Sequence, residues 1–346
     1  MRSWIMPWAV LCYISLSAAF AQNPSDHADR HMSLNVVVTD KSGKPVPGLR
    51  QEDFTLLDNK QPQKILSFAA VEGGRQGSGP QVEVILLLDE VNAAFTSVAF
   101  ERAEVAKFLQ RDGGQLAYPV SIGFLSDSGA TMGSTSRDGN ALVAEMNEHA
   151  GGLRSVTRKQ GIYGDNERFQ ISINALEQFA GAKTISSGRK LAIWISPGWP
   201  LLTGPRIELS ARDQQNLFDT IVTLSDALRR ANITLYSIDP LGTADAGGIR
   251  TTYYEEFVKG VRKPEQAQFG NLALQVLDVQ SGGRVFNSSN DVAGEIARCI
   301  ADASDYYVLA FDGLPGDGPN EYHSLEIKLD KPKLKALTRA GYYAQP

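Results

Sequence analysis

Short extended segments separated by turns mark both ends of the chain. Between Ser33 and Val71, apolar residues recur at every second position at Leu34, Val36 and Val38, and glycines and prolines interrupt the pattern. This is typical of strands in an antiparallel sheet. The runs YYVLAF, HSLEIKLD and KALTRAGYY near the C-terminus have the same character. Because so few strands cannot form a core alone, we predict that residues 33–72 and 306–346 pair as one small antiparallel β-sandwich.

Residues 82–305 follow a different pattern, in which apolar strands alternate with amphipathic helices. Strands buried on both faces of a parallel sheet read as nearly continuous apolar runs, and the runs here are VEVILLLDE, PVSIGFLSDS, KLAIWISPG and ITLYSIDP, followed by the short GRVF. Helices are expected between them, around 98–109, 168–180, 213–230, 271–279 and 291–304, whereas the segment from about 129 to 165 is expected to be rich in loops. The alternation predicts an α/β fold with a doubly wound, mostly parallel sheet. A Gly-rich linker at 73–81 joins it to the N-terminal β segment.

Residues 1–21 have the features of a secretory signal peptide. Arg2 precedes an apolar run from about Ile5 to Ala19, and Ala19-Phe20-Ala21 has the small-x-small form of a cleavage site. We therefore predict cleavage after Ala21 and a secreted or periplasmic protein, with an uncleaved anchor as the alternative. We expect no transmembrane segment in the mature chain.

The composition is that of a globular protein, with 42% hydrophobic and 21% charged residues among 346. The 34 basic and 39 acidic side chains give a net charge of -5, which argues against a surface for nucleic acid or anionic lipid. Four His and two Cys make zinc sites and disulfide frameworks hard to assemble. Cys299 is expected on the buried face of a helix, and solvated surface positions are expected for His27, His31, His149 and His323.

Polar side chains follow the predicted strands at the points where the strands end. Asp89 and Asn92 come after the first strand, Asp127 after the second, Ser196 after KLAIWI, and Asp239 after ITLYSI. The carboxyl ends of parallel strands meet at one edge of a sheet, where ligands bind. Acidic oxygens gathered there suit magnesium or calcium. For each residue taken alone, the alternative is that it caps the helix that follows.

The loop SPGWPLLTGPRIEL offers candidate contacts for a partner. Ser196, Trp199 and Arg206 lie in a segment stiffened by three prolines, and exposed aromatic and arginine side chains on a rigid loop are typical interface anchors. We predict these three as partner-binding residues. The alternative is that Trp199 folds back over the sheet edge as part of the core.

The order of these motifs resembles a known family. LLLDE, GFLSDS, KLAIWISPGWP, ITLYSIDP, SGGRVF and the YYVLAF to AGYYA tail, together with the N-terminal GKPVPGLRQEDFTLLDNKQPQKILSF, are similar to the von Willebrand factor A related domain proteins of acidobacteria. The resemblance covers essentially the whole mature chain. It implies a von Willebrand factor A, Rossmann-like α/β domain over residues 82–305. It also implies a role in protein binding and adhesion, often through a metal-ion-dependent adhesion site at which the partner completes the cation shell.

The chain departs from that metal site at several positions. The family loop is Asp-x-Ser-x-Ser, whereas Val91 and Ala93 follow Asp89 at the hydroxyl positions, and Ser196 and Pro197 stand where a Thr-Asp-Gly would be. We therefore interpret Asp89, Asn92, Asp127 and Asp239 as a degenerate site. No cofactor is certain, and magnesium or calcium is the candidate.

The predicted function is that of an exported, non-catalytic binding module rather than an enzyme. It would recognise a protein or cell-envelope partner at the carboxyl edge of the sheet. The first alternative is a magnesium- or calcium-dependent adhesin that uses the same acidic cluster. The second, a secreted α/β hydrolase, has no motif behind it, since G-x-G-x-x-G, G-x-x-x-x-G-K-[ST] and G-x-S-x-G are all missing from the sequence.

Overall fold

The computed structural model describes residues 30–73, 82–149, 161–184, 188–200, 202, 208–242 and 256–346. The predicted signal peptide, nearly all of the predicted linker, and Arg206 lie outside these ranges. No helix among the described residues is long and apolar enough to cross a membrane.

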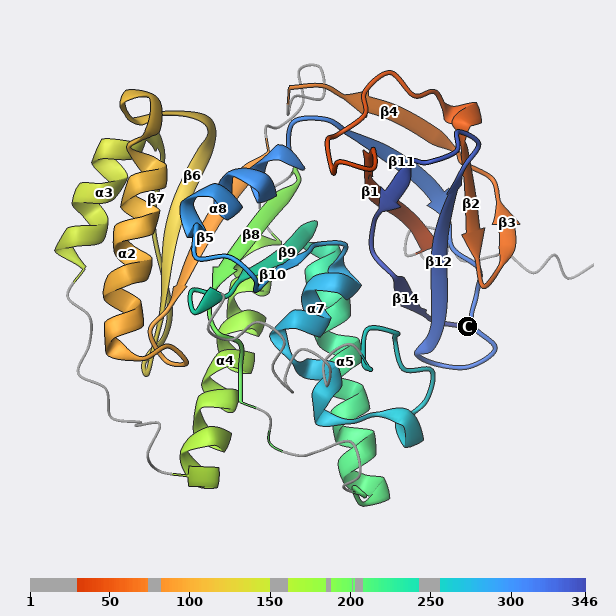
Figure 1. The fold of residues 1–346 in the computed structure, drawn as a ribbon. Coiled ribbons are helices and arrows are strands. Elements are labelled where there is room, and N and C mark those ends of the chain that lie inside the picture. Colours follow the sequence, from red (N-terminus) through yellow and green to blue (C-terminus); the bar gives the residue numbers. More distant parts are fainter. Residues whose placement is uncertain are drawn as a thin grey trace, which may run out of the picture.

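A six-stranded sheet forms the centre of the α/β part (Figure 1). Its strands are parallel except the edge strand β7, which pairs with β6 in the antiparallel sense. In spatial order they are β10 (Val285–Phe286), β9 (Ile233–Ile238), β8 (Lys190–Ile195), β5 (Glu83–Asp89), β6 (Gln115–Ser126) and β7 (Gly129–Asp138). The prediction of a mostly parallel α/β sheet accompanied by antiparallel sheets is confirmed.

Helices cover both faces of this sheet. Side chains alternate along β5, so Ile85 and Leu87 pack with one helical layer, and Leu86 and Leu88 pack with the other. The first layer consists of α4 (Gly161–Lys183), α5 (Ala211–Arg230) and α7 (Leu274–Ser281). The second consists of α2 (Phe95–Leu109), α3 (Gly139–Glu148) and α8 (Val292–Ala301). Burial on both faces explains why the central strands are almost wholly apolar.

The loop-rich segment predicted from about 129 to 165 is wrong for residues 129–148, which form β7 and α3. Strand β7 has no buried position and is rich in Gly, Ser and Thr, so its sequence lacks an alternating apolar pattern. Asp138 then starts α3 by accepting hydrogen bonds from the Asn140 and Ala141 N–H groups. The pairing with β6, rather than local propensity, determines this strand.

Two four-stranded antiparallel sheets form a sandwich from the two ends of the chain, at the upper right of Figure 1. Strand β1 pairs with β11, and β2 pairs with β12, so each sheet joins N-terminal to C-terminal strands. One sheet contains β13 (Lys335–Leu337), β1 (His31–Thr39), β11 (Tyr306–Asp312) and β4 (Ser67–Val71). The other contains β14 (Gly341–Ala344), β12 (Glu321–Leu329), β2 (Phe54–Asp58) and β3 (Gln61–Gln63). Their inner faces share one hydrophobic core.

Short 3-10 helices complete the described structure. They are η1 (Gln51–Asp53), η2 (Arg111–Gly114), η5 (Pro264–Gln266) and η6 (Phe269–Leu272).

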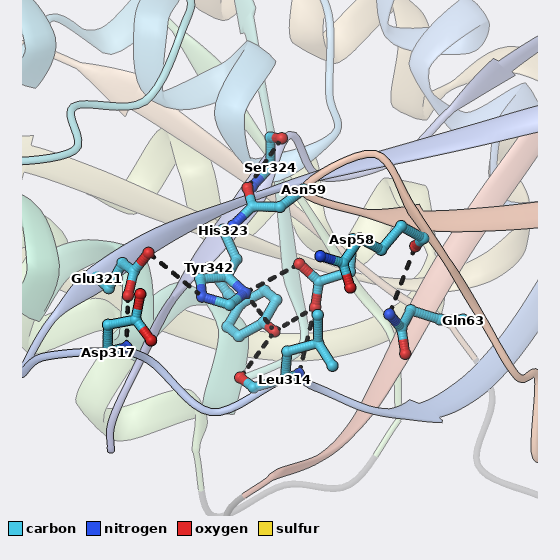
Figure 2. A network of polar contacts seen from close by, with 10 residues as sticks. Asp58, Asn59, Gln63, Leu314, Asp317, Glu321, His323, Ser324 and Tyr342 are labelled. Carbon is cyan, nitrogen blue, oxygen red and sulfur yellow. Dashed lines mark hydrogen bonds and ion pairs between the residues drawn. The ribbon is translucent and has the colours of Figure 1, made fainter.

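A buried network of hydrogen bonds links β2, from the N-terminal segment, to β12 and β14, from the C-terminal segment (Figure 2). The Asp58 carboxylate lies 2.9 Å from His323 Nδ1 and accepts a hydrogen bond of 2.5 Å from the Tyr342 hydroxyl. The Leu314 N–H approaches the same carboxylate at 3.3 Å. His323 is only 3% exposed, so the expectation of a solvated histidine is wrong at this position. Its partner Asp58 is 265 residues away in sequence, which hid the pairing from sequence analysis.

The sandwich packs against the amino edge of the parallel sheet. Arg189 is the residue before β8. Its guanidinium lies 4.3 Å from the centre of the Tyr306 ring and donates a hydrogen bond to the Asp302 carbonyl at 2.7 Å. Asn35 Nδ2 of β1 donates to Asn232 Oδ1, just before β9, at 2.6 Å. These contacts leave the opposite, carboxyl edge of the sheet for other interactions.

Candidate binding site at the carboxyl edge of the sheet

Asp89, the last residue of β5, is the centre of a buried hydrogen-bond cluster. Its Oδ1 accepts from the backbone N–H groups of Val91 and Asn92 at 3.0 and 2.8 Å. Its Oδ2 accepts from Asn92 Nδ2 and Ser196 Oγ, both at 2.8 Å, and from Trp194 Nε1 at 3.2 Å. The carboxylate is 0% exposed. Five donors therefore occupy the roughly four acceptor sites of one carboxylate.

Burial raises the pKa of Asp89, and the hydrogen bonds from Asn92, Ser196 and Trp194 act in the opposite direction. Removing a carboxylate from water disfavours its charged form, whereas donors aimed at its oxygens favour that form. The cluster thus replaces the water that the charge loses on folding.

Asn92 connects the end of β5 to α4. Its Nδ2 also lies 2.9 Å from Ser172 Oγ, and Ser172 in turn donates to the Arg168 carbonyl at 2.8 Å. In the metal interpretation, Asn92 would offer an oxygen to a cation. Instead its amide nitrogen faces Asp89, because a carboxylate accepts hydrogen bonds and repels a carbonyl oxygen.

The other predicted metal residues occupy separate turns. Asp239 directly follows β9. Its own N–H donates to the Phe286 carbonyl at 2.7 Å, and its carboxylate accepts from the Leu241 N–H at 2.9 Å. Asp127 is half-buried in the turn between β6 and β7. Among the residues described, no group of three or more His, Cys, Asp or Glu side chains is arranged to hold a metal ion.

Two of the predicted partner-binding residues, Ser196 and Trp199, are buried, so the prediction of Trp199 as an exposed anchor is wrong. Ser196 is 1% exposed, donates to Asp89, and accepts from the Gly198 N–H at 3.0 Å. Trp199 is also 1% exposed, with its ring 5.2 Å from that of Trp194 at an angle of 73°. The alternative, in which Trp199 folds over the sheet as part of the core, describes the structure. Arg206 lies outside the described residues.

A second polar cluster lies beside the first, between β5, β6, α2 and α3. The Arg102 guanidinium lies 2.7 Å from Glu90 Oε1 and donates to the carbonyls of Met146 and His149. The His149 ring stacks on Phe124 with centroids 3.7 Å apart. Glu90 is 7% exposed. These contacts fix the end of α3 against the sheet edge.

Two large aromatic side chains are strongly exposed at this edge. Phe95 begins α2, six residues after β5 ends, and is 80% exposed. Tyr163 lies in the first turn of α4 and is 89% exposed. Helix α4 runs antiparallel to β5, since Lys183 near its end pairs with Glu83 at the start of β5 at 2.5 Å. The first turn of α4 therefore lies beyond the carboxyl end of the strand.

Sequence analysis missed both aromatic residues for a physical reason. Phe95 lies three positions before Val98, which is buried, so its spacing matches the buried stripe of α2. Tyr163 precedes the apolar positions of α4 and carries no distinguishing pattern. These two side chains can be distinguished from core residues only when the direction of each helix relative to the sheet is known.

No family model and no curated protein matches the chain. Among solved structures, the pilus adhesin SpaC from Lactobacillus rhamnosus GG in its open conformation is 10% identical with a TM-score of 0.39, covering 87% of this chain and 49% of that one. The conserved hypothetical protein BatB from Bacteroides thetaiotaomicron is 15% identical with a TM-score of 0.31, covering 64% and 98%. Three N-terminal domains of the pili tip protein Mfa5 from Porphyromonas gingivalis are 7% identical with a TM-score of 0.35, covering 90% and 66%. The chain thus spans about half the length of the SpaC chain, and similarities this remote leave function to be inferred from the site.

Proposed function

We propose that the chain is an exported, non-catalytic binding module with a von Willebrand factor A type α/β domain. Its carboxyl edge recognises a protein or cell-envelope partner through Phe95 and Tyr163. The observation that carries the proposal is the exposure of these two rings, 80% and 89%, beside a rigid hydrogen-bonded support. Large exposed apolar side chains are unfavourable in water and concentrate at interaction sites.

The buried cluster around Asp89 supports a structural role for the residues behind that surface. It links the ends of β5 and β8 and the middle of α4 through Asp89, Ser196, Asn92 and Ser172. A surface held in this way changes little on binding, which limits the conformational entropy lost when a partner is captured.

The same cluster supports binding that does not depend on a cation at Asp89. A cation would have to displace the Asn92 amide and the Ser196 hydroxyl, both 2.8 Å from Asp89 Oδ2. Magnesium binds through carboxylates with near-octahedral geometry and gives up its water reluctantly, so it gains little from replacing donors that are already in position.

The state of the nucleophilic groups supports a role other than catalysis. Ser196 Oγ donates to Asp89 rather than to a histidine that could accept its proton. Cys299 is 0% exposed, and burial raises the pKa of its thiol well above the usual value. Burial and the hydrogen bond to Asp58 likewise raise the pKa of Tyr342. An activated nucleophile requires the opposite change.

Site-specific photo-cross-linking tests the proposal. A benzophenone amino acid is placed at position 95 or 163, and at Lys333 on the sandwich as the control, and each full-length variant is exposed to envelopes of the cells that make it. Cross-links to one partner from positions 95 and 163, and none from 333, are expected. Cross-links confined to position 333 would contradict the proposal.

A further inference from the structure

A small cavity lies between the sandwich and the α/β part, away from the carboxyl edge. It measures about 20 Å³ and is bounded by the last turns of α5 and α7 and by β12, β14 and the segment before β14. Helix α5 ends at Arg230, directly before β9 begins at Ile233, so the cavity lies toward the amino edge of the sheet. Arg339, Tyr322, Tyr343 and Ser225 are among its lining residues.

Arg339 adds a positively charged guanidinium to the lining of this cavity. Its guanidinium makes no hydrogen bond or ion pair with any residue in the described ranges. Burial lowers the pKa of Arg339 to about 10, and the nearby charge of Arg229 acts in the same direction. Arg339 is half-buried, and a charge partly removed from water without a partner is unfavourable, so such a group normally binds an anion or an acidic side chain.

The nearest acidic residue is already used by other arginines. Asp226 Oδ1 lies 3.4 Å from Arg229 Nε, and Asp226 Oδ2 lies 3.7 Å from Arg230 Nη2. Asp226 attracts Arg339 only at longer range. Three arginines thus lie near one aspartate, and the net charge around the cavity is positive.

Tyr343 adds a hydroxyl group to the lining. The Tyr343 oxygen is buried and has no hydrogen bond of normal geometry within the described part of the chain. Burial raises the pKa of this phenol, which keeps it a neutral donor. The Val261 N–H approaches the Tyr343 oxygen, so it is the hydroxyl hydrogen that is left without an acceptor, which is unfavourable for a buried group.

The wall of the cavity is formed before any ligand binds. The rings of Tyr322 and Tyr343 meet at 5.3 Å between centroids. The Tyr322 ring lies against Gly341, where an added Cβ would come within 2.4 Å of the ring carbon that carries the hydroxyl. Glycine at 341 therefore allows the ring to approach the backbone closely.

We propose that this cavity binds a small carboxylate on Arg339. The planar guanidinium can donate two parallel hydrogen bonds to the two carboxylate oxygens, and Tyr343 supplies a further donor. A cavity of about 20 Å³ has room for one or two water-sized groups, which matches a carboxylate better than a bulky phosphate ester. Because the lining comes from α5, α7, β12 and β14, the bound group would tie the sandwich to the α/β part. The inference is independent of the function proposed for the carboxyl edge.

The test uses the full chain labelled with ¹⁵N-arginine. The Nε–H signal of Arg339 is identified by its loss in Arg339→Gln, or in Arg339→Lys if the first variant fails to fold. The protein is titrated with sodium acetate and with N-acetylglutamate amide, each against sodium chloride of the same ionic strength. Acetate represents a free carboxylate, and the blocked glutamate represents an acidic side chain of a partner.

A saturable movement of the Arg339 signal with either carboxylate, and none with chloride, is expected. Tyr343→Phe should weaken the affinity at least threefold, whereas Lys335→Gln, which removes one charge from the exposed part of β13, should leave it unchanged. A signal that stays in place, or that moves equally with chloride, overturns the proposal.

Discussion

Asn92 Nδ2 lies 2.8 Å from Asp89 Oδ2, so an amide donor faces the carboxylate at the end of the central strand. In the adhesion site that the sequence resembles, the corresponding aspartate serves a cation. In this protein the oxygens of the Asp89 carboxylate accept hydrogen bonds from N–H and O–H groups instead. These bonds hold the carboxyl edge of the sheet as a rigid part of the fold. The stability of the protein should then depend on Asp89 more than on any divalent ion.

Replacing Asp89 by alanine should destabilise the protein by about 3 to 5 kcal/mol, because Asn92, Ser196 and Trp194 would lose their common acceptor. Urea unfolding monitored by circular dichroism measures the change. Asp330→Ala, at an exposed position, is the matched control and should change stability by less than about 0.5 kcal/mol. An equal effect of the two substitutions would mean that the cluster carries no stability.

Calorimetric titration with magnesium or calcium should give no saturable heat attributable to Asp89, because its oxygens already accept five hydrogen bonds. Wild type and Asp89→Asn should behave alike. A saturable heat in the wild type that disappears in Asp89→Asn would instead establish the cation-dependent adhesin.

Stability should fall as the pH rises from about 4.5 to 7 because of Glu295. This residue of α8 is 2% exposed, its Oε2 has no hydrogen-bond partner within the described ranges, and burial raises its pKa from 4.5 to about 7. Across this interval the folded protein keeps a proton that the unfolded chain has released, so the stability present below pH 4.5 is lost as the pH passes 7.

The contribution of Glu295 should be on the order of 2 kcal/mol. Urea unfolding at about pH 5 and pH 7.5 should therefore show a larger drop for the wild type than for Glu295→Gln, which cannot ionise. Parallel behaviour of the two proteins would rule out Glu295 as the cause.

Tyr342→Phe should lower the free energy of unfolding by about 1 to 2 kcal/mol, because Asp58 would lose the 2.5 Å hydrogen bond from the hydroxyl (Figure 2). Tyr163→Phe removes a hydroxyl from an exposed ring and serves as the control, with no measurable loss expected. The difference between the two unfolding curves is the measured quantity. A loss of similar size in both would show that the buried network contributes nothing specific.

The sequence was most informative where both faces of a strand are buried. The runs around Leu87, Trp194 and Tyr236 are apolar because helices cover both sides of the sheet, and that pattern predicted β5, β8 and β9 correctly. Strand β7 was not predicted because it lies at the sheet edge and has no buried position. Its structure depends on the partner strand β6, which local patterning does not reveal.

The candidate site was predicted only in part for a similar reason. Residue order placed Asp89, Asn92 and Ser196 at one sheet edge, and their hydrogen bonds join them there. Whether a side chain such as Trp199 or Phe95 points into the core or into solvent depends on packing between distant segments. Trp199 is 1% exposed and Phe95 is 80% exposed, although both residues follow a buried strand by a few positions.

The affinity of the cross-linked partner for the purified chain tests the central claim most directly. Its dissociation constant is measured for the wild type with and without EDTA, for Phe95→Ala, and for Leu66→Ala as an exposed apolar control on the sandwich. We predict no effect of EDTA or of Leu66→Ala, and a loss of about 2 kcal/mol, roughly thirtyfold in affinity, for Phe95→Ala. Loss of binding in EDTA, with Phe95→Ala binding like the wild type, would contradict the account.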